Sequence, residues 1–155
     1  MSLLGNFKEL KKDELFEIDY EISSAAYFQN EISKLVEKSG VIQNDYIFEK
    51  FSSSKFQIYK YRPIYFKKFF FDKDPKNKHD KNAIKIIASA GMTSLQIGFI
   101  PADSNIQFSK LKKEGKIYNV NLYITGGPKK IYDNYCIKII NEPYYVHLNI
   151  LFKKK

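Results

Sequence analysis

The spacing of apolar and polar positions changes along the chain, and the change predicts a helical first part and a strand-rich remainder. Apolar residues between Tyr27 and Val36 recur at helical spacing, and Gly40 follows the last turn. We therefore expect a helix over residues 24–38, capped by a serine at its start. Residues 7–22 fit no single apolar stripe, which favours a short helix or an irregular segment.

Strand-like patterns begin after the serine triplet at residues 52–54, which is the strongest boundary signal in the chain. Bulky and polar residues then alternate up to Pro63, and later apolar runs are separated by turn-forming residues. A second helix is expected between Pro101 and Gly115. The predicted strands cover residues 56–61, 64–72, 82–89, 95–100 and 117–127, which ends at Gly126 and Gly127, with one or two more between 131 and 152.

The fold class that follows is mainly β with α additions. Residues 1–52 are expected to form an N-terminal helical extension, and residues 53–155 a β-rich domain. Short strands with one inserted helix suit a small OB/SH3-like β-barrel. The extension would pack on the barrel, or hold two copies of the chain together as a homo-oligomer, through Tyr27, Phe28, Leu35 and Val36.

Basic residues outnumber acidic ones, 26 to 17, which gives a formal charge of +9. Such an excess suits a polyanionic partner or an anionic membrane face. The basic residues are almost all lysine, as in proteins from AT-rich genomes, and we assign about half of this signal to coding bias. Composition alone therefore gives only weak support for nucleic acid binding.

The chain has one cysteine, Cys136, in an apolar run, so we expect a buried, inert thiol and no internal disulfide. No stretch approaches the ~20 apolar residues of a membrane span, and the N-terminus lacks a signal-peptide core. These features favour a cytoplasmic protein without a membrane partner. No Walker, GxGxxG, HExxH, CxxC or GxSxG motif occurs, so we expect neither catalysis nor a cofactor or metal.

The stretch DPKNKHDKN, residues 74–82, is longer and more polar than a plain turn requires. One interpretation is structural, with Asp80 accepting backbone N–H bonds and Asn82 satisfying the next turn. The other is a binding loop that presents His79 to a ligand. A hydrolase that uses His79 and Asp80 is a weaker hypothesis, because no motif supplies a nucleophile or a metal.

The run YKYRPIYFKKFFF, residues 59–71, interleaves aromatic and basic side chains. Tyrosine and arginine can stack on bases while lysine meets phosphate. The phenylalanines are better explained as core residues. Tyr61 and Arg62 remain open between a structural and a binding role, and Arg62 is the one arginine of the chain.

Together, DPKNKHDKNAIKI, then GFIP, then a helix and VNLYITGG resemble the HIRAN domain. The resemblance rests on the run D-P-x-N-x-x-D-x-N-A-I followed closely by Gly98 and Pro101, and it covers about residues 55–152. It implies a small barrel of OB or SH3-like type with helical insertions. In helicase-fused members the domain is similar to a clamp on single-stranded DNA that recognises a free 3′-hydroxyl.

The resemblance also implies where DNA would be contacted. The contacts would come from the first strand, the polar loop and the GFIP segment. DNA-end binders commonly have tyrosine at the position of His79 and basic residues just after Phe99, where this chain has Pro101 and Ala102. The residues that correspond to the family's contacts are Tyr61, Arg62, Asn77, His79, Asp80 and Phe99.

We therefore expect a non-enzymatic module that binds single-stranded DNA or a free 3′-hydroxyl DNA end. The alternative is a protein–protein interaction module on a barrel that has lost DNA binding, which His79 and the Pro101-Ala102 departure favour. Preference for an accessible 3′-hydroxyl would separate the two.

Overall fold

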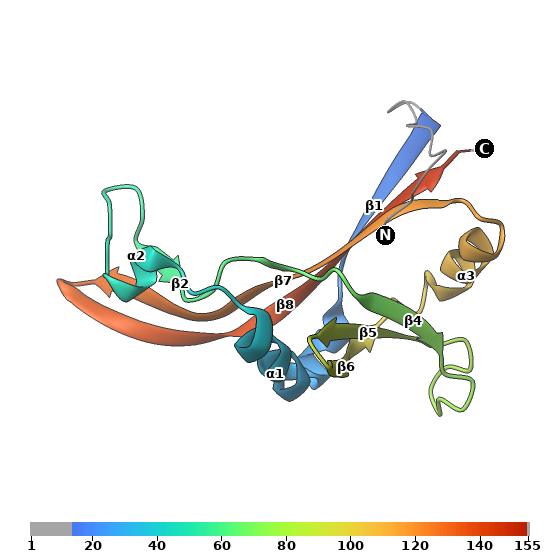
Figure 1. Cartoon of the computed structure of the whole chain (residues 1–155), viewed down its shortest axis with the longest axis horizontal. Coiled ribbons are helices and arrows are strands. Elements are labelled where there is room, and N and C mark those ends of the chain that lie inside the picture. Colours follow the sequence, from blue (N-terminus) through green and yellow to red (C-terminus); the bar gives the residue numbers. More distant parts are fainter. Residues whose placement is uncertain (1–13, 155) are drawn as a thin grey trace.

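Two antiparallel sheets form the framework of residues 14–154, the part of the chain that this computed structural model describes (Figure 1). The elements are β1 (Leu15–Glu21), η2 (Ser23–Tyr27), α1 (Gln29–Ser39), α2 (Asn44–Ile47), β2 (Gln57–Tyr59), β3 (Ile64–Tyr65), β4 (Phe69–Lys73), β5 (Ile84–Ala90), β6 (Thr93–Phe99), α3 (Asn105–Lys113), β7 (Ile117–Asp133) and β8 (Cys136–Lys153).

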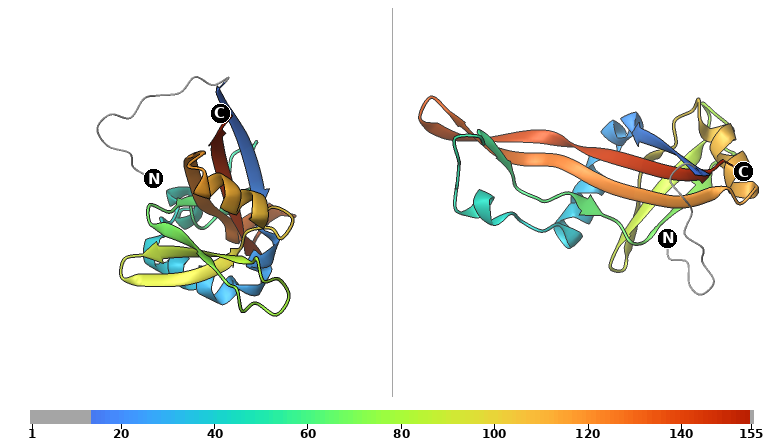
Figure 2. Two further views of the ribbon diagram at one scale, coloured as in Figure 1. Left: turned by 90° about the vertical axis from the view of Figure 1, so that its right-hand side faces the viewer. Right: turned by 90° about the horizontal axis from the view of Figure 1, so that it is seen from above.

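The larger sheet is built on one long hairpin of β7 and β8. Its strand order is β1-β8-β7-β2, and the short β3 pairs with β7 as well. β1 covers only the second half of β8, from His147 to Lys153. The hairpin therefore runs past the rest of the molecule as a narrow ribbon, with β2 and α2 beside its far part, as two further views show (Figure 2). We call the ribbon from residue 128 to 142, with β2, the distal arm.

The smaller sheet is the meander β4-β5-β6, as the sequence predicts. β5 alternates cleanly, with Ile84, Ile86, Ala88 and Ala90 buried on one face. This period of two is what a strand with one face on the core requires. The loop of residues 74–83 lies at one end of the meander, and the turn at Gly91 lies at the other.

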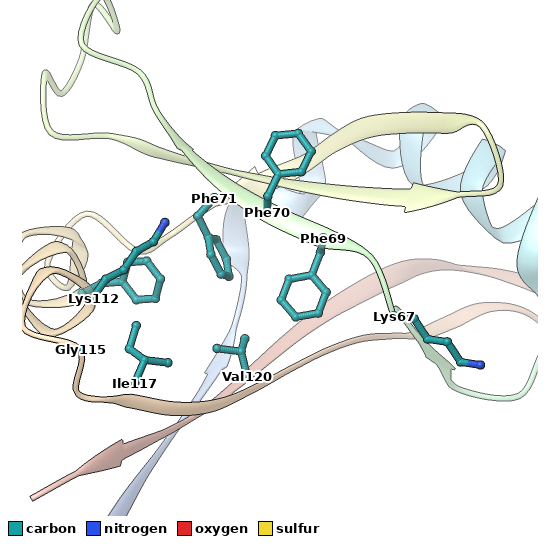
Figure 3. A pocket seen from close by; sticks show the side chains of 9 residues that line it. Lys67, Phe69, Phe70, Phe71, Lys112, Gly115, Ile117 and Val120 are labelled. Atoms are coloured by element: carbon teal, nitrogen blue, oxygen red, sulfur yellow. The ribbon is translucent and has the colours of Figure 1, made fainter. Parts of the chain in front are cut away.

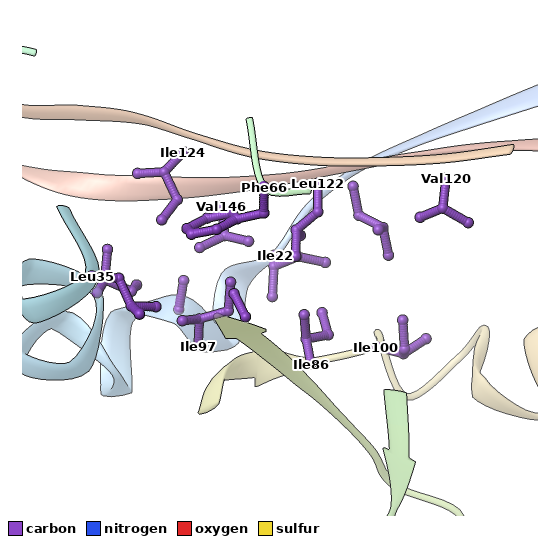
Figure 4. Close-up of a cluster of buried hydrophobic side chains, with 14 of the residues drawn as sticks. Ile22, Leu35, Phe66, Ile86, Ile97, Ile100, Val120, Leu122, Ile124 and Val146 are labelled. Atoms are coloured by element: carbon purple, nitrogen blue, oxygen red, sulfur yellow. The ribbon is translucent and has the colours of Figure 1, made fainter. Parts of the chain in front are cut away.

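The core fills the space between the two sheets, and α1 closes it on one side (Figure 4). Ile32, Leu35 and Val36 of α1 are fully buried there, at helical spacing. The central strands add residues from both sheets, including Ile86, Ile97, Leu122, Ile124, Val146, Leu148 and Ile150. Tyr27 does not join this packing, because its side chain is 87% exposed.

The predicted fold class, mainly β with helical additions, is confirmed. The expected helix at 24–38 appears as η2 and α1, and the second helix as α3. The two sheets pack in a barrel-like manner, but no strand pairing joins them into a closed barrel within residues 14–154. The division at residues 52–53 stays a prediction, although buried residues of α1 and of the later strands belong to one core cluster.

The short helix or irregular segment predicted for residues 7–22 is wrong for its second half. Residues 15–21 form β1, which pairs with β8 along its whole length, with Phe16 opposite Phe152. Alternation in this strand is imperfect, so its conformation is fixed by the partner strand rather than by local pattern. Residues 7–13 lie outside the described part of the chain.

The strand predicted to end at Gly126 and Gly127 instead continues to Asp133. Both glycines have positive φ, 86° and 83°, and the register of β7 against β8 shifts between Gly126 and Pro128. They form a β-bulge, at which a strand bends without ending. A Cβ atom on Gly127 would lie 2.4 Å from the ring of Tyr144, so the position also needs the absence of a side chain.

The prediction of a buried thiol at Cys136 is also wrong. Cys136 begins β8 at the tip of the distal arm and is exposed. The apolar run around it, including Ile137, Ile139 and Ile140, lies beyond the reach of the core and stays exposed as well. Within residues 14–154, the outer edge of β8 from Cys136 to Tyr145 carries no strand, since β1 reaches only to His147.

Candidate nucleic-acid interface

The loop between β4 and β5 is held in shape by hydrogen bonds among its own residues. The Asp74 N–H donates to the Ala83 carbonyl at 2.9 Å and closes the loop. The Asn77 side-chain oxygen accepts the N–H groups of His79 and Asp80, at 2.9 and 3.1 Å. These are the side-chain-to-backbone bonds that asparagine forms readily in turns.

Asp80 fixes the loop to the rest of the domain. One carboxylate oxygen accepts the Asn82 N–H at 2.8 Å, and the other accepts the side-chain amide of Asn105 at 2.6 Å. Asn105 is the first residue of α3 and is 2% exposed. The structural interpretation of the loop is thereby borne out for Asp80, which ties the loop to the start of α3.

Sequence reasoning missed Asn105. A signal was present, because Asn105 lies three residues before Phe108 and so shares the buried side of the predicted helix. A polar residue on that side needs a partner when buried. The sequence does not say which of the loop's carboxylates supplies it.

His79 lies at the exposed surface of this fixed loop. Its backbone N–H is used by the loop, whereas no hydrogen bond or ion pair within residues 14–154 involves its imidazole ring. Three exposed lysines, Lys76, Lys78 and Lys81, stand on the same loop, and none of them belongs to an ion pair in the described chain. The loop therefore offers a ring and three cations to an anionic ligand.

Phe99 lies at the same end of the smaller sheet. It ends β6 opposite Lys85, the second residue of β5 after the loop. Its N–H donates to the Ser24 hydroxyl at 2.8 Å, and its ring packs edge-on against Phe28, with centroids 5.9 Å apart. Phe99 is half-buried, so part of the ring remains available near the loop.

Tyr61 and Arg62 lie elsewhere. The Arg62 N–H donates to the Val41 carbonyl at 3.0 Å, and the Arg62 side chain lines a cavity together with residues 89–91 of the β5–β6 turn. That turn and the loop lie at opposite ends of β5, whose seven residues span roughly 20 Å. The structure thus brings Asn77, His79 and Asp80 together, with Phe99 nearby, and leaves Tyr61 and Arg62 at the far end.

The distal arm carries a separate charged cluster. Glu142 accepts the Tyr59 hydroxyl at 2.5 Å and the Lys129 ammonium at 2.9 Å. These two hydrogen bonds hold the pKa of Glu142 below its ordinary value of 4.5, and the bond from Tyr59 contributes most. The hydrogen bond to Glu142 and, after it, burial raise the pKa of Tyr59 above 10.0.

No group of three or more His, Cys, Asp or Glu side chains in residues 14–154 is arranged to hold a metal ion. None of the helices in this part of the chain has the length and apolar character needed to cross a membrane.

Comparison with known families identifies the region that contains the loop. The family model of the HIRAN domain matches residues 64–139, from β3 through the start of β8, and so includes the loop, α3 and the smaller sheet. No curated protein and no solved structure matches the chain. HIRAN domains bind nucleic acid, which agrees with the exposed lysines around His79. The chain is therefore a HIRAN domain protein, and its loop of residues 74–83 belongs to a nucleic-acid-binding domain.

Proposed function

We propose that this protein binds single-stranded DNA at a free 3′-hydroxyl end, through the loop of residues 74–83, without catalysing a reaction. The observation that carries the proposal is the loop itself, which is rigidly hydrogen-bonded and yet presents an unpartnered imidazole and three lysines. A site that is already formed costs little ordering when the ligand binds.

Each group of the loop has a role in this proposal. The imidazole of His79 stacks on the terminal base, and the lysines meet phosphates. Each oxygen of Asp80 accepts one hydrogen bond from the protein, and a carboxylate oxygen can accept two. An oxygen of this half-buried carboxylate accepts a second hydrogen bond, from the terminal 3′-hydroxyl of the strand.

Fluorescence anisotropy with a short labelled strand tests the proposal, with the 3′ end either free or phosphorylated. We expect tighter binding to the free end, because a terminal phosphate adds negative charge beside Asp80. His79→Ala should weaken binding about fivefold or more, since stacking contributes about 1–3 kcal/mol per base. His79 supplies only its backbone to the loop, so the variant keeps the loop intact.

Gln107→Ala, on the exposed side of α3, is the matched control and should bind as the wild type does. Equal affinity for the two strand ends would contradict end recognition. Unchanged affinity in His79→Ala would move the site away from the loop.

A protein-interaction module is the second candidate, favoured by exposed apolar side chains on the distal arm. Ile139 and Tyr135 are 62% and 92% exposed there. Exposed apolar surface of this kind is typical of binding surfaces for proteins. This candidate predicts no anisotropy change with either strand at about 50 mM salt, where even weak electrostatic binders respond.

A further inference from the structure

A groove runs along the side of α3 that faces β4. It consists of two adjoining cavities of about 440 and 530 Å³, which share Phe71, Phe108 and Lys112. Figure 3 shows the residues that line the first of them. Cavities of this size hold small ligands in many proteins. The first lies between β4 and the start of β7, and the second lies between the end of β4 and α3.

The floor of the groove is aromatic and aliphatic. Phe69 and Phe71 extend from β4 toward Ile117 and Val120 of β7, whereas Phe70 points the other way (Figure 3). Phe71 packs edge-on against Phe108, with centroids 4.9 Å apart. Phe69 and Phe71 pack against the core but are only half-buried, so their rings also line the cavity.

The rim of the groove is uniformly basic. No acidic residue lines either cavity, and none of the rim lysines takes part in an ion pair within residues 14–154. The lysines in the last turn of α3 interact favourably with the helix dipole. Lys67, which precedes β4, and Lys73, which ends it, have no such role. The exposed rim lysines are Lys67, Lys73, Lys110, Lys112 and Lys113.

The groove begins beside the loop. Lys73 directly precedes the loop and Ile84 follows it, and both line the second cavity. Asn105, which binds Asp80, starts the helix that forms the groove's other wall. The first cavity continues from there, past Lys112, to Lys67.

We propose that this groove holds the nucleotides that precede the 3′ end of the bound strand, with a base against Phe71 and phosphates along the rim lysines. The inference rests on the proposed function and adds a second subsite to it. The charges favour this occupant over a fatty acid. A fatty acid has one anionic head, whereas the lysines are distributed along the whole groove, as successive phosphates would need.

A double variant, Lys67→Ala with Lys112→Ala, tests the groove by anisotropy against two 3′-hydroxyl strands, a dinucleotide and one of about ten nucleotides. Affinity for the longer strand should fall about tenfold. The slope of log affinity against log salt concentration should become shallower by about 1.4, the value for two lost phosphate contacts on a single strand. Affinity for the dinucleotide should stay unchanged, because it reaches only the loop.

The matched control is Lys34→Ala with Lys55→Ala, two exposed lysines that line neither cavity, so the same charge is removed away from the groove. An equal loss in this control, or no loss in the groove variant, would overturn the inference. If the groove variant loses affinity while free and phosphorylated ends bind alike, the groove stands and end recognition fails.

Photo-crosslinking gives a second measurement that does not depend on a folded variant. A strand with 5-iodouracil a few nucleotides before its 3′ end should crosslink to the peptide that contains Phe71. Crosslinks confined to other peptides, or a lipid anion retained by the wild type in native mass spectrometry and displaced by no DNA, would overturn the assignment.

Discussion

At the scale of single residues, the amide of Asn105 couples the exposed loop to the buried face of α3. Its donor lies 2.6 Å from an Asp80 carboxylate oxygen, and Asn105 as a whole is only 2% exposed. Asn105→Ala removes that donor and leaves one carboxylate oxygen without its partner. We expect a loss of about 1.5–3 kcal/mol in unfolding free energy, the usual net contribution of a hydrogen bond to a charged group.

Chemical denaturation measures this loss, with Gln107→Ala as the control from the exposed side of the same helix. The variant should also bind a DNA end less tightly, because the loop loses its attachment. A stability equal to that of the wild type would show that the loop holds itself without α3.

Residue patterns predict part of this site and not the rest. The short spacing from Asn77 to Asp80 and Asn82 is typical of local side-chain-to-backbone bonds, and these occur. The bond to Asn105 spans 25 residues, and nothing local specifies it. The exposure of Cys136 likewise depends on where the hairpin leaves the core.

At the scale of elements, the Glu142 cluster links β2, β7 and β8 in the distal arm. Since folding lowers the pKa of Glu142, its contribution to stability is fully present above about pH 4.5 and is lost as the pH falls through the lowered pKa. We expect Glu142→Gln to melt at a lower temperature than the wild type at pH 7, with the difference narrowing below pH 4.5.

Thermal unfolding at a series of pH values checks this prediction. The NMR chemical shift of the Glu142 carboxyl carbon, followed as the pH changes, gives the pKa of this group directly. Asp133→Asn is the matched control, because its pairing with Lys138 at 3.6 Å is exposed. A midpoint at or above 4.5 for Glu142 would contradict the expectation.

Elements with a strong internal pattern are those that the sequence predicts correctly. α1 has its apolar stripe, and β5 has strict alternation. β1 was missed because its extended form depends on pairing with β8, some 130 residues away. The two glycines predict a strand end where the structure has a bulge, because both features place glycine at positive φ.

At the scale of the whole molecule, α1 and both sheets share one core, so we expect one cooperative unfolding transition. Leu35→Ala should lower the unfolding free energy by about 2–5 kcal/mol, as large-to-small changes at fully buried sites do. Urea unfolding followed by circular dichroism and by tyrosine fluorescence should give coincident curves.

Glu37→Ala, exposed on the same helix, is the control. Two separate transitions, with only the first shifted by Leu35→Ala, would instead support independent folding of the part before residue 53.

Strand content and the meander follow from the sequence, but the wide separation of Arg62 from His79 does not. It depends on the path by which β3 and β4 cross between the sheets.

The edge of β8 from Cys136 to Pro143, on which no strand lies within residues 14–154, affects how the protein behaves in concentrated solution. An open strand edge with exposed isoleucines can template the strand of another molecule and so begin aggregation. Lys138 adds a charge within that edge, which opposes such pairing. This residue acts as a gatekeeper, so neutralising Lys138 would make the arm the place where fibrous assembly starts.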